Sequence, residues 1–484
     1  MAEARAGAQI SRKAFTQSIV ILLVLMIFTG LMTRFIPAGE FERTMKEGRE
    51  IVLPGTYQAI ERPDYPIWRW FTAPVEVLWS DSGVMIVVII IFLLMVGASF
   101  AVLDKSGILK AALTKIVNRF GAKRYLLLGI ISLFFMLMGA FFGIFEEVVP
   151  LVPVVLTLSY VMGWDALVGL GMSILAVNLG FSAAITNPFT IGIAQNLAGL
   201  PLFSGAGYRI VIFISIYALL VLFLINYAKR IEKNPKVSHV YHEEAEMRVK
   251  NVSQNLELYM TDEKCFRRAI IWLSVFLVLI MGALLSGPFI PGLSDFALPI
   301  VGLLFLAAGV GAGIISGTGK SQIGRAVKEG LLGIAPGIPL ILMAASIKHI
   351  VTAGGILDTI LNRGVQSLDG VSGFPAAMII YFLALFVEFF IGSASAKAFL
   401  LMPILLPLAD LVGVTRQIAV TAYCFGDGFS NLAYPTNPVL LIVLGLTVVS
   451  YPKWMRWTLK LWLGVLAITA GFLALATLIN FGPF

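Results

Sequence analysis

Long apolar runs without charge limit what this chain can fold into more than any other feature. A hydrocarbon core of roughly 30 Å is crossed by about 20 residues of helix, and every backbone polar group inside it must be hydrogen-bonded within the protein. Only 13% of the residues are charged, about half the share of an ordinary soluble domain. The sequence therefore predicts an all-α polytopic membrane protein. The expected spans are 14–36, 82–103, 165–198, 208–228, 267–286, 296–316, 331–350, 415–450 and 454–482.

Basic residues are concentrated between the apolar runs. Nine Lys and Arg lie in the loop 229–268, and Arg5, Arg12 and Lys13 precede the first span. By the positive-inside rule both segments face the cytoplasm. Counting crossings then places the N-terminus inside and the C-terminus outside the inner (cytoplasmic) membrane. The formal charge of +8 is thus explained by topology, so we expect the lipid bilayer and not nucleic acid as a partner.

The segment 124–163 carries two adjacent glutamates in apolar surroundings. It is too long for one ordinary span, Glu146 and Glu147 fall near its middle, and Pro150 and Pro153 follow at once. A charge at the bilayer centre costs about 3 kcal/mol on insertion scales, so it needs a partner or a water-filled cavity. We therefore expect two half-length helices that meet at a polar tip. Such a re-entrant hairpin would enter from the cytoplasm.

The second half of the chain repeats the order of elements in the first. SGILKAALTKIVNRFG, which starts at Ser106, matches GGILDTILNRGVQSLDG, which starts at Gly354. VPLVP matches LMPILLP, and ITNPF matches YPTNP, both at an offset of 250 residues. Three matched elements in one order predict an internal repeat. The paired elements are the re-entrant hairpins 124–163 and 374–412 and the broken transmembrane helices 165–198 and 415–450.

Charge at the flanks of the two repeats predicts opposite orientations. The stretch 104–124 carries six Lys and Arg, whereas its counterpart 354–373 carries only Arg363. By the positive-inside rule the first lies on the cytoplasmic side and the second does not. Inverted repeats with broken elements near mid-membrane are typical of secondary transporters. The expected division is 1–228 for the first inverted repeat, 229–290 for a cytoplasmic loop and linking span, and 291–484 for the second inverted repeat.

The same Thr-Asn-Pro triplet interrupts both predicted broken helices. Proline frees a backbone carbonyl and pushes the preceding residue out of the helical region. The unwound stretch can offer carbonyls to a cation and a half-helix N-terminus to an anion. A single Asn-Pro would favour a kink in an ordinary span, but its presence in both repeats favours a binding site. The predicted residues are Thr186, Asn187, Pro188, Thr436, Asn437 and Pro438, with Asn187 and Asn437 as potential Na⁺ ligands.

The tip of the second hairpin differs in charge from the first. Small residues at Ser393, Ala394 and Ser395 would let a ligand approach closely, and Lys397 takes the place of Glu147 at the 250-residue offset. In one interpretation, Lys397 forms an ion pair with a tip glutamate that has only a structural role. In another, one of the two glutamates titrates as a proton or cation site. Other deep polar residues are Glu388, Asp427, Asn431, Asn178 and Ser182, of which Asp427 and Asn431, with Glu146 and Glu147, are candidates for ion coupling.

These residues predict a secondary active transporter of a small carboxylated metabolite. Lys397 and the half-helix N-termini would receive its carboxylate, and the tip glutamates would bind an amino group, Na⁺ or H⁺. We expect no cofactor and no enzymatic activity, because no nucleophile–base pair, HExxH motif or phosphate-binding loop is present. His239 and His242 lie in a polar loop where a solvated face is more probable than a metal cluster. An ion channel would also need deep polar residues, but it has no need of two opposed hairpins.

The stretches PAGEFER, FFGIFEEVVPLVP, ITNPFTIGIAQNLAGLPLFSG and YPTNP resemble the YfcC-like group of the DcuC family, within the ion transporter superfamily. The resemblance implies an inverted-repeat fold with a scaffold and a transport domain, a homodimer and elevator-type alternating access. It also implies either four-carbon dicarboxylates or basic amino acids as substrates. An ionised Glu146–Glu147 pair would repel a dicarboxylate, so the tip charges favour an amino acid, with a dicarboxylate as the alternative.

Overall fold

The computed structural model describes residues 12–46, 49–80, 83–108, 123–244, 263–286, 296–368 and 370–482. In that part of the chain, ten helices are long and apolar enough to cross a membrane. The prediction of a helical, multi-pass membrane protein is therefore confirmed. Most of the basic stretch 104–124, and residues 245–262 of the polar loop, lie outside the described residues.

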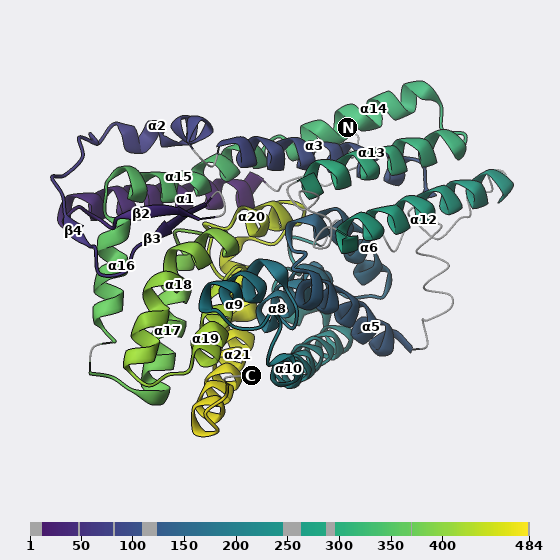
Figure 1. Ribbon diagram of the computed structural model, residues 1–484. Helices are drawn as coiled ribbons and strands as arrows, with labels where there is room; N and C mark the ends of the chain where they lie inside the picture. The colour runs from purple at the N-terminus through teal and green to yellow at the C-terminus, as the bar shows by residue number, and fades with distance from the viewer. Residues whose placement is uncertain are drawn as a thin grey trace.

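One group of helices runs across the upper part of Figure 1. Helix α3 packs against α13 and α14, α12 packs against α13, and α15 packs against α1 and α2. Much of this group is exposed: the apolar window within 265–283 is only 17% buried, as expected of surface that faces lipid. Its members are α1 (Arg12–Phe35), α2 (Arg69–Glu76) with the 3₁₀ turn η1 (Val77–Trp79), α3 (Gly83–Lys105), α12 (Glu263–Ser286), α13 (Ala297–Ile315), α14 (Lys320–Ile334) and α15 (Gly337–Ala353).

A second group holds the hairpins and the interrupted helices, below the first group in Figure 1. The first-half elements are α5 (Arg124–Leu137), the π-helix η3 (Met138–Phe142), the 3₁₀ turn η4 (Glu146–Leu151), α6 (Val152–Val161), α7 (Ala166–Leu170), the π-helix η5 (Gly171–Leu175), α8 (Ala176–Ala183), the π-helix η6 (Pro188–Gly192), α9 (Ile193–Ala198), α10 (Ala206–Lys233) and the 3₁₀ turn η7 (Pro235–Val237). The second-half elements are α16 (Leu357–Gln366), α17 (Gly373–Glu388), α18 (Ala394–Leu411), α19 (Arg416–Phe429), α20 (Pro438–Gly445) and α21 (Tyr451–Leu478). The apolar window within 166–198 is 100% buried, so the core lies here.

Glycines allow each hairpin to pack directly on an interrupted helix. A Cβ at Gly180 of α8 would overlap the carbonyl of Met136 in α5, and a Cβ at Gly426 of α19 would overlap the carbonyl of Tyr381 in α17. The two interrupted helices also cross, since α8 packs against α19 and a Cβ at Gly428 would overlap Ser182. Two hairpin–helix pairs therefore meet at the centre of this group.

Four short strands correct the prediction of a purely helical chain. They form two antiparallel pairs: β1 (Gly39–Glu40) with β4 (Gln58–Ala59), and β2 (Arg43–Lys46) with β3 (Arg49–Val52). The segment docks on α16, where Asp358 accepts the backbone N–H of Phe41 at 2.9 Å and pairs with Arg43 at 2.7 Å. Strands of two to four residues have too short an alternation to stand out in a polar stretch.

A short break divides the region in which the span 331–350 is expected. The structure ends α14 at Ile334 and starts α15 at Gly337, with Pro336 at the N-cap of α15. A proline supplies no N–H to the preceding helix and disfavours helical geometry in the residue before it. The first four residues of the expected span therefore belong to α14, which packs along α3.

The polar segment after α10 is partly packed against the rest of the protein. Glu244 is buried and accepts the backbone N–H of Ala166 at 2.8 Å. Asp165, at the turn between α6 and α7, accepts hydrogen bonds from Tyr227 at 2.8 Å and Ser238 at 2.7 Å. His239 and His242 are exposed, as expected. These contacts fix the start of the first interrupted helix to the end of α10.

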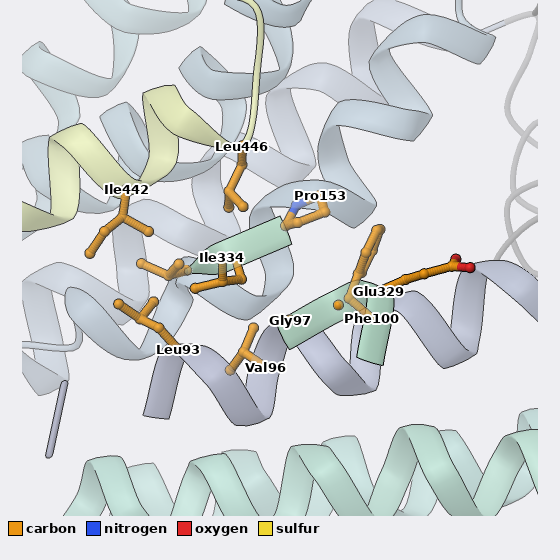
Figure 2. A pocket seen from close by; sticks show the side chains of 11 residues that line it. Leu93, Val96, Gly97, Phe100, Pro153, Glu329, Ile334, Ile442 and Leu446 are labelled. Atoms are coloured by element: carbon orange, nitrogen blue, oxygen red, sulfur yellow. The ribbon is translucent and has the colours of Figure 1, made fainter. Parts of the chain in front are cut away.

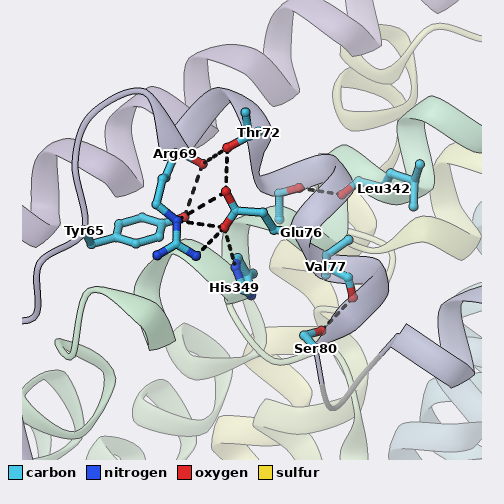
Figure 3. A network of polar contacts seen from close by, with 9 residues as sticks. Tyr65, Arg69, Thr72, Glu76, Val77, Ser80, Leu342 and His349 are labelled. Carbon is cyan, nitrogen blue, oxygen red and sulfur yellow. Dashed lines mark hydrogen bonds and ion pairs between the residues drawn. The ribbon is translucent and has the colours of Figure 1, made fainter.

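Helix α2 is held to α15 by a polar network, shown in Figure 3. Glu76 pairs with Arg69 at 2.6 Å and contacts Nε2 of His349 at 3.4 Å. The Arg69 guanidinium lies 4.8 Å from the ring centre of Tyr65. Hydrogen bonding from Arg69 lowers the pKa of Glu76 to about 2, although burial opposes the shift. The network anchors a short helix that is not long enough to span the membrane.

Candidate functional site

The first interrupted helix breaks between Ala183 and Pro188. Ala184 adopts a left-handed conformation, with φ 45° and ψ 53°, which costs a non-glycine residue about 1–2 kcal/mol. Thr186 is held by the end of the first hairpin: its N–H donates to Ala140 O at 3.1 Å and its hydroxyl to Phe141 O at 3.0 Å. The break is thus a fixed irregular segment packed on the hairpin.

The two Asn-Pro pairs start the second half of each interrupted helix in the same way. Oδ1 of Asn187 accepts the N–H of Phe189 at 2.9 Å, and Oδ1 of Asn437 accepts the N–H of Val439, also at 2.9 Å. The prolines take the first helical position, where no N–H is needed. Both predicted asparagines are therefore N-caps, a role that needs no bound Na⁺.

The side-chain amide groups of the asparagines also have equivalent partners. Nδ2 of Asn187 donates to Phe181 O at 3.2 Å, and Nδ2 of Asn437 donates to Oδ1 of Asn431 at 3.3 Å. Phe181 and Asn431 are related by the same 250-residue offset as the asparagines. Asn431, a candidate for ion coupling, therefore helps to shape the second break.

The first tip places its glutamates beside the first break. Gly143 has φ 67°, and a Cβ there would overlap Oδ1 of Asn187, so tip and break are in direct contact. Glu146 and Glu147 begin η4 and are half-buried. Oε2 of Glu147 accepts the N–H of Phe145 at 3.2 Å. The two acidic side chains thus lie at the tip with part of their surface open.

The second tip is made of small residues. Gly392 and Ser393 are exposed, whereas Ala394 and Ser395 are half-buried. The Ser393 hydroxyl accepts the N–H of Ala396 at 3.5 Å and caps α18. The hydroxyl of Tyr423, from α19, donates to Ala394 O at 2.7 Å. This tip is therefore tied to its own interrupted helix, as the first tip is.

Lys397 does not pair with the glutamates of the first tip, which corrects one interpretation of the sequence. Its Nζ contacts Oε2 of Glu388 and lies 2.9 Å from Oδ1 of Asp427. Glu388 ends α17, Lys397 is in the first turn of α18, and Asp427 lies in α19. We call these three residues the buried triad. The three side chains are at most 1% exposed, so the ammonium of Lys397 is not open to a solute in this arrangement.

A buried arginine that sequence reasoning missed holds the first break. Arg209, in the first turn of α10, donates to Ile185 O at 3.0 Å, Ser204 O at 2.8 Å and Phe203 O at 3.2 Å. It is 1% exposed, and its hydrogen-bond partners within the described residues are these carbonyls. The sequence feature that could have identified Arg209 is its position inside the expected span 208–228, where a charge is costly.

Neutral donors serve the second break. The hydroxyl of Tyr451 donates to Ala433 O at 2.7 Å, and Nε1 of Trp454 donates to Leu432 O at 2.8 Å. Both come from the start of α21, the helix that follows the second break as α10 follows the first. Each unwound segment thus has carbonyls satisfied by the next long helix, with a charged donor in one case and neutral donors in the other.

The buried side chain of Asn178 lies in α8, the helix that crosses α19. Neither Nδ2 nor Oδ1 of Asn178, in α8, makes a hydrogen bond within the described residues, and the residue is fully buried. Ser182, one turn later, donates to the backbone carbonyl of Asn178 at 2.9 Å. Unpaired buried amides are rare in native proteins and require an explanation such as a bound water.

The hairpins also reach across to the opposite interrupted helix. Helix α18 of the second hairpin packs against η6 and α9, which follow the first break. The tip segment η4 of the first hairpin packs against α20, which follows the second break. Each hairpin thus contacts both interrupted helices.

A small apolar cavity lies between these elements and the upper group, as Figure 2 shows. It is about 20 Å³ in volume, room for roughly one water molecule. Its lining includes Leu93 and Gly97 of α3, Ile334 of α14, Pro153 of α6 and Ile442 of α20. It does not contain the predicted site residues, and it marks the seam between the two groups of helices.

The candidate site combines acidic groups, half-helix N-termini and satisfied carbonyls. Among the described residues no cluster of three or more His, Cys, Asp and Glu side chains could hold a metal ion. Half-buried carboxylates suit an amine or another cation, and the N-termini that follow Asn187 and Asn437 suit an anion. These are the groups that a solute with both signs of charge would need.

Comparisons with known proteins agree over nearly the whole length. The family model of DcuC, described as a C4-dicarboxylate anaerobic carrier, matches residues 15–478. “Putative basic amino acid antiporter YfcC” of Escherichia coli strain K12 is 28% identical over 475 residues, which are 92% of this chain and 93% of that protein. An uncharacterized protein of Haemophilus influenzae is 27% identical over 419 residues, 85% of this chain and 79% of that protein.

Two solved structures are also similar. Neisseria gonorrhoeae MtrF, whose structure is described as illuminating a class of antimetabolite efflux pumps, is 18% identical with a TM-score of 0.44, covering 96% of this chain and 95% of that one. The Alcanivorax borkumensis YdaH transporter is 17% identical with a TM-score of 0.41, covering 97% of this chain and 99% of that one.

Proposed function

Because the chain belongs to the DcuC family, we propose that it is a secondary active transporter of a small carboxylated metabolite, with a basic amino acid as the first candidate. The observation that carries the proposal is the crossing of α8 and α19 in the buried core. Each of these helices is interrupted just beyond the crossing and packs on a hairpin that carries charge at or beside its tip. Broken helices at mid-membrane suit a solute that must be bound and released on either side.

The site residues divide by charge in this proposal. Glu146 and Glu147 receive the amine of the substrate, because they are the half-buried acidic groups at a tip. The carboxylate is received at the half-helix N-termini capped by Asn187 and Asn437, beside the small residues Ser393, Ala394 and Ser395. Lys397 takes a different role from the one expected, because two carboxylates already engage its ammonium.

The family and its named member point to two substrate classes. The family description is a C4-dicarboxylate carrier, whereas the name of the Escherichia coli relative refers to basic amino acids. Two glutamates at one tip favour an amino acid, since a dicarboxylate would need an intervening cation or proton. A dicarboxylate is the alternative substrate, coupled to H⁺ or Na⁺.

Counterflow in proteoliposomes tests the proposal. Vesicles loaded with arginine, ornithine or succinate are offered the same radiolabelled solute outside, and we expect saturable exchange of the amino acids. Glu147→Gln should abolish exchange of arginine, while Glu61→Gln, a change at an exposed site in the segment before α2, should not. Exchange of succinate alone would reject the amino-acid assignment. Flux without saturation or counterflow would indicate a channel.

The orientation and assembly belong to the same proposal. The two halves are inverted repeats in a scaffold-and-transport arrangement that works by an elevator motion, in a homodimer in the inner membrane. The N-terminus is cytoplasmic and the C-terminus is outside. Reporter fusions at the C-terminus test the orientation, because a cytoplasmic fluorescent signal there would contradict it. The mass of the purified particle, corrected for detergent, tests the dimer.

A further inference from the structure

The buried triad contains more negative than positive charge. Two carboxylates, on Glu388 and Asp427, face one ammonium, on Lys397, and the three residues are at most 2% exposed. With all three ionised the cluster would carry one uncompensated negative charge. Such a charge in a protein interior costs several kcal/mol unless a partner or a proton neutralises it.

The groups around the triad do not supply the missing positive charge. The hydroxyl of Tyr423 is uncharged and donates a hydrogen bond to Ala394 O. Cys424, its neighbour in α19, is a buried free thiol. Arg209, the other buried cation in this part of the described chain, donates its hydrogen bonds to the carbonyls of Ile185, Phe203 and Ser204. The excess charge therefore has to be balanced within the triad itself.

Hydrogen bonding leaves room for a proton. Oδ1 of Asp427 and Oε2 of Glu388 contact the ammonium of Lys397. The Tyr423 hydroxyl also lies beside Asp427, but its hydrogen bond is donated to Ala394 O. A protonated carboxyl is a donor as well as an acceptor. One added proton would thus remove the excess charge and supply a donor in a cluster of acceptors.

A sodium ion fits this cluster poorly. The ammonium of Lys397 already occupies the position between the two carboxylates. A metal cation beside it would meet like-charge repulsion that the low-dielectric interior does not screen. A proton bound to one carboxylate oxygen needs no such space.

We propose that the buried triad Glu388–Lys397–Asp427 is the coupling-ion site of this transporter, and that the ion is one proton held by the two carboxylates. The inference rests on the proposed transport function and assigns its coupling ion. The three residues come from both arms of the second hairpin and from the second interrupted helix. A proton there stabilises the closed hairpin, and its release leaves a charge that requires water. Loss of the proton therefore favours an opened hairpin, since a ligand shifts a conformational equilibrium by its differential affinity for the two states.

Infrared difference spectroscopy of the purified protein in lipid tests the proton directly. The wild-type protein should show the carbonyl stretch of a protonated carboxylic acid at neutral pH, and alkaline pH should remove it. Glu388→Gln or Asp427→Asn should remove or shift this band. Asp410→Asn should leave it unchanged, because Asp410 is an exposed acid at the far end of the same α18, paired with Arg416.

Transport measurements on the same variants test coupling. The wild-type protein should accumulate its solute when a pH gradient is imposed, and a sodium gradient should have no effect. Glu388→Gln and Asp427→Asn should lose this accumulation, whereas Asp410→Asn should retain it. The wild-type spectrum and the wild-type gradient response need no substitution, so the inference remains testable if a triad variant fails to fold.

Three results would overturn the inference: a wild-type spectrum without the acid band, accumulation driven by sodium and indifferent to pH, or proton-driven accumulation that survives both triad substitutions. Failure of the proposed function looks different. In that case no tested solute would exchange, and the acid band would be present but unconnected to transport.

Discussion

The two hairpin–helix units share one architecture but place their charges in opposite ways. In the first unit Glu146 and Glu147 lie half-buried at the tip, and the buried charge is Arg209, which holds carbonyls of the break and the adjoining turn. In the second unit the tip is formed by small residues, and Lys397 is enclosed with Glu388 and Asp427. The break of this unit is held by the neutral donors Tyr451 and Trp454. The difference suggests a division of labour, with solute contact in the first unit and ion coupling in the second.

Lys397→Met should cause the largest loss of stability, and it tests whether the buried triad holds the second unit together. It leaves two buried carboxylates without their cation, and removal of one partner of a buried ion pair costs about 3–5 kcal/mol. Unfolding in mixed detergent micelles measures the loss. Lys453→Met is the matched control, because its pair with Glu243 is partly exposed and should contribute about 1 kcal/mol or less. Equal losses in the two variants would show that the triad does not hold the second unit together.

Arg209→Met tests the first side of the comparison. It removes the donors to three carbonyls, and each buried acceptor left unsatisfied costs about 1–3 kcal/mol. We expect a clear loss of stability that is smaller than the loss in Lys397→Met, because carbonyls carry only partial charge. Arg230→Met, at an exposed position near the other end of α10, serves as the control and should change stability little. If the midpoint of unfolding of Arg209→Met equals that of the wild-type protein, the first break does not need the Arg209 cation.

Ala184→Gly sharpens the description of the first break. Glycine adopts positive φ without the steric cost that Ala184 carries, so this substitution should raise stability by up to about 1 kcal/mol. Ala183→Gly, at the last helical residue of α8, should instead lower it by up to about 1 kcal/mol. The measurement is the change in free energy of unfolding of each variant, which should have opposite signs in the two. A loss in both would indicate that the left-handed residue is not strained.

Glu76 lies outside both units, and its substitution Glu76→Gln should cause the smallest change in stability. The pKa of Glu76 is lowered from 4.5 to about 2, so its network contributes fully above about pH 4.5 and is lost as pH falls towards 2. An ion pair of this exposure contributes about 1 kcal/mol or less. The free energies of unfolding of Glu76→Gln and of the wild-type protein should be measured across that pH range. They should differ at pH 4.5 and above and become equal at low pH. A constant difference at every pH would exclude the ionised carboxylate as the cause.

The positions of the helix breaks were predictable from local chemistry. Asn187-Pro188 and Asn437-Pro438 combine an N-cap with a residue that cannot continue a preceding helix, so the boundary follows from two adjacent residues. Glu146 likewise marked the first tip, because an acidic residue inside a long apolar segment demands a polar environment. These signals need no knowledge of tertiary contacts.

The partners of the buried charges were not predictable. Glu388 and Asp427 were recognised as deep polar residues, but their pairing with Lys397 depends on how α17, α18 and α19 pack. Arg209 resembles the many basic residues that flank spans, and only its carbonyl partners reveal its role. The short strands β1 to β4 were missed because their stability comes from docking on α16, which the local sequence does not encode.

The backbone contacts at Gly180 and Gly426 limit how this protein can change shape. At these seams a carbonyl rests where a side chain would otherwise stand, so no layer of flexible side chains exists there to absorb sliding. If the protein works by the elevator motion that we propose, each hairpin should move together with the helix it touches. The displacement would then fall along the apolar boundary with α3 and α14, where the small cavity lies.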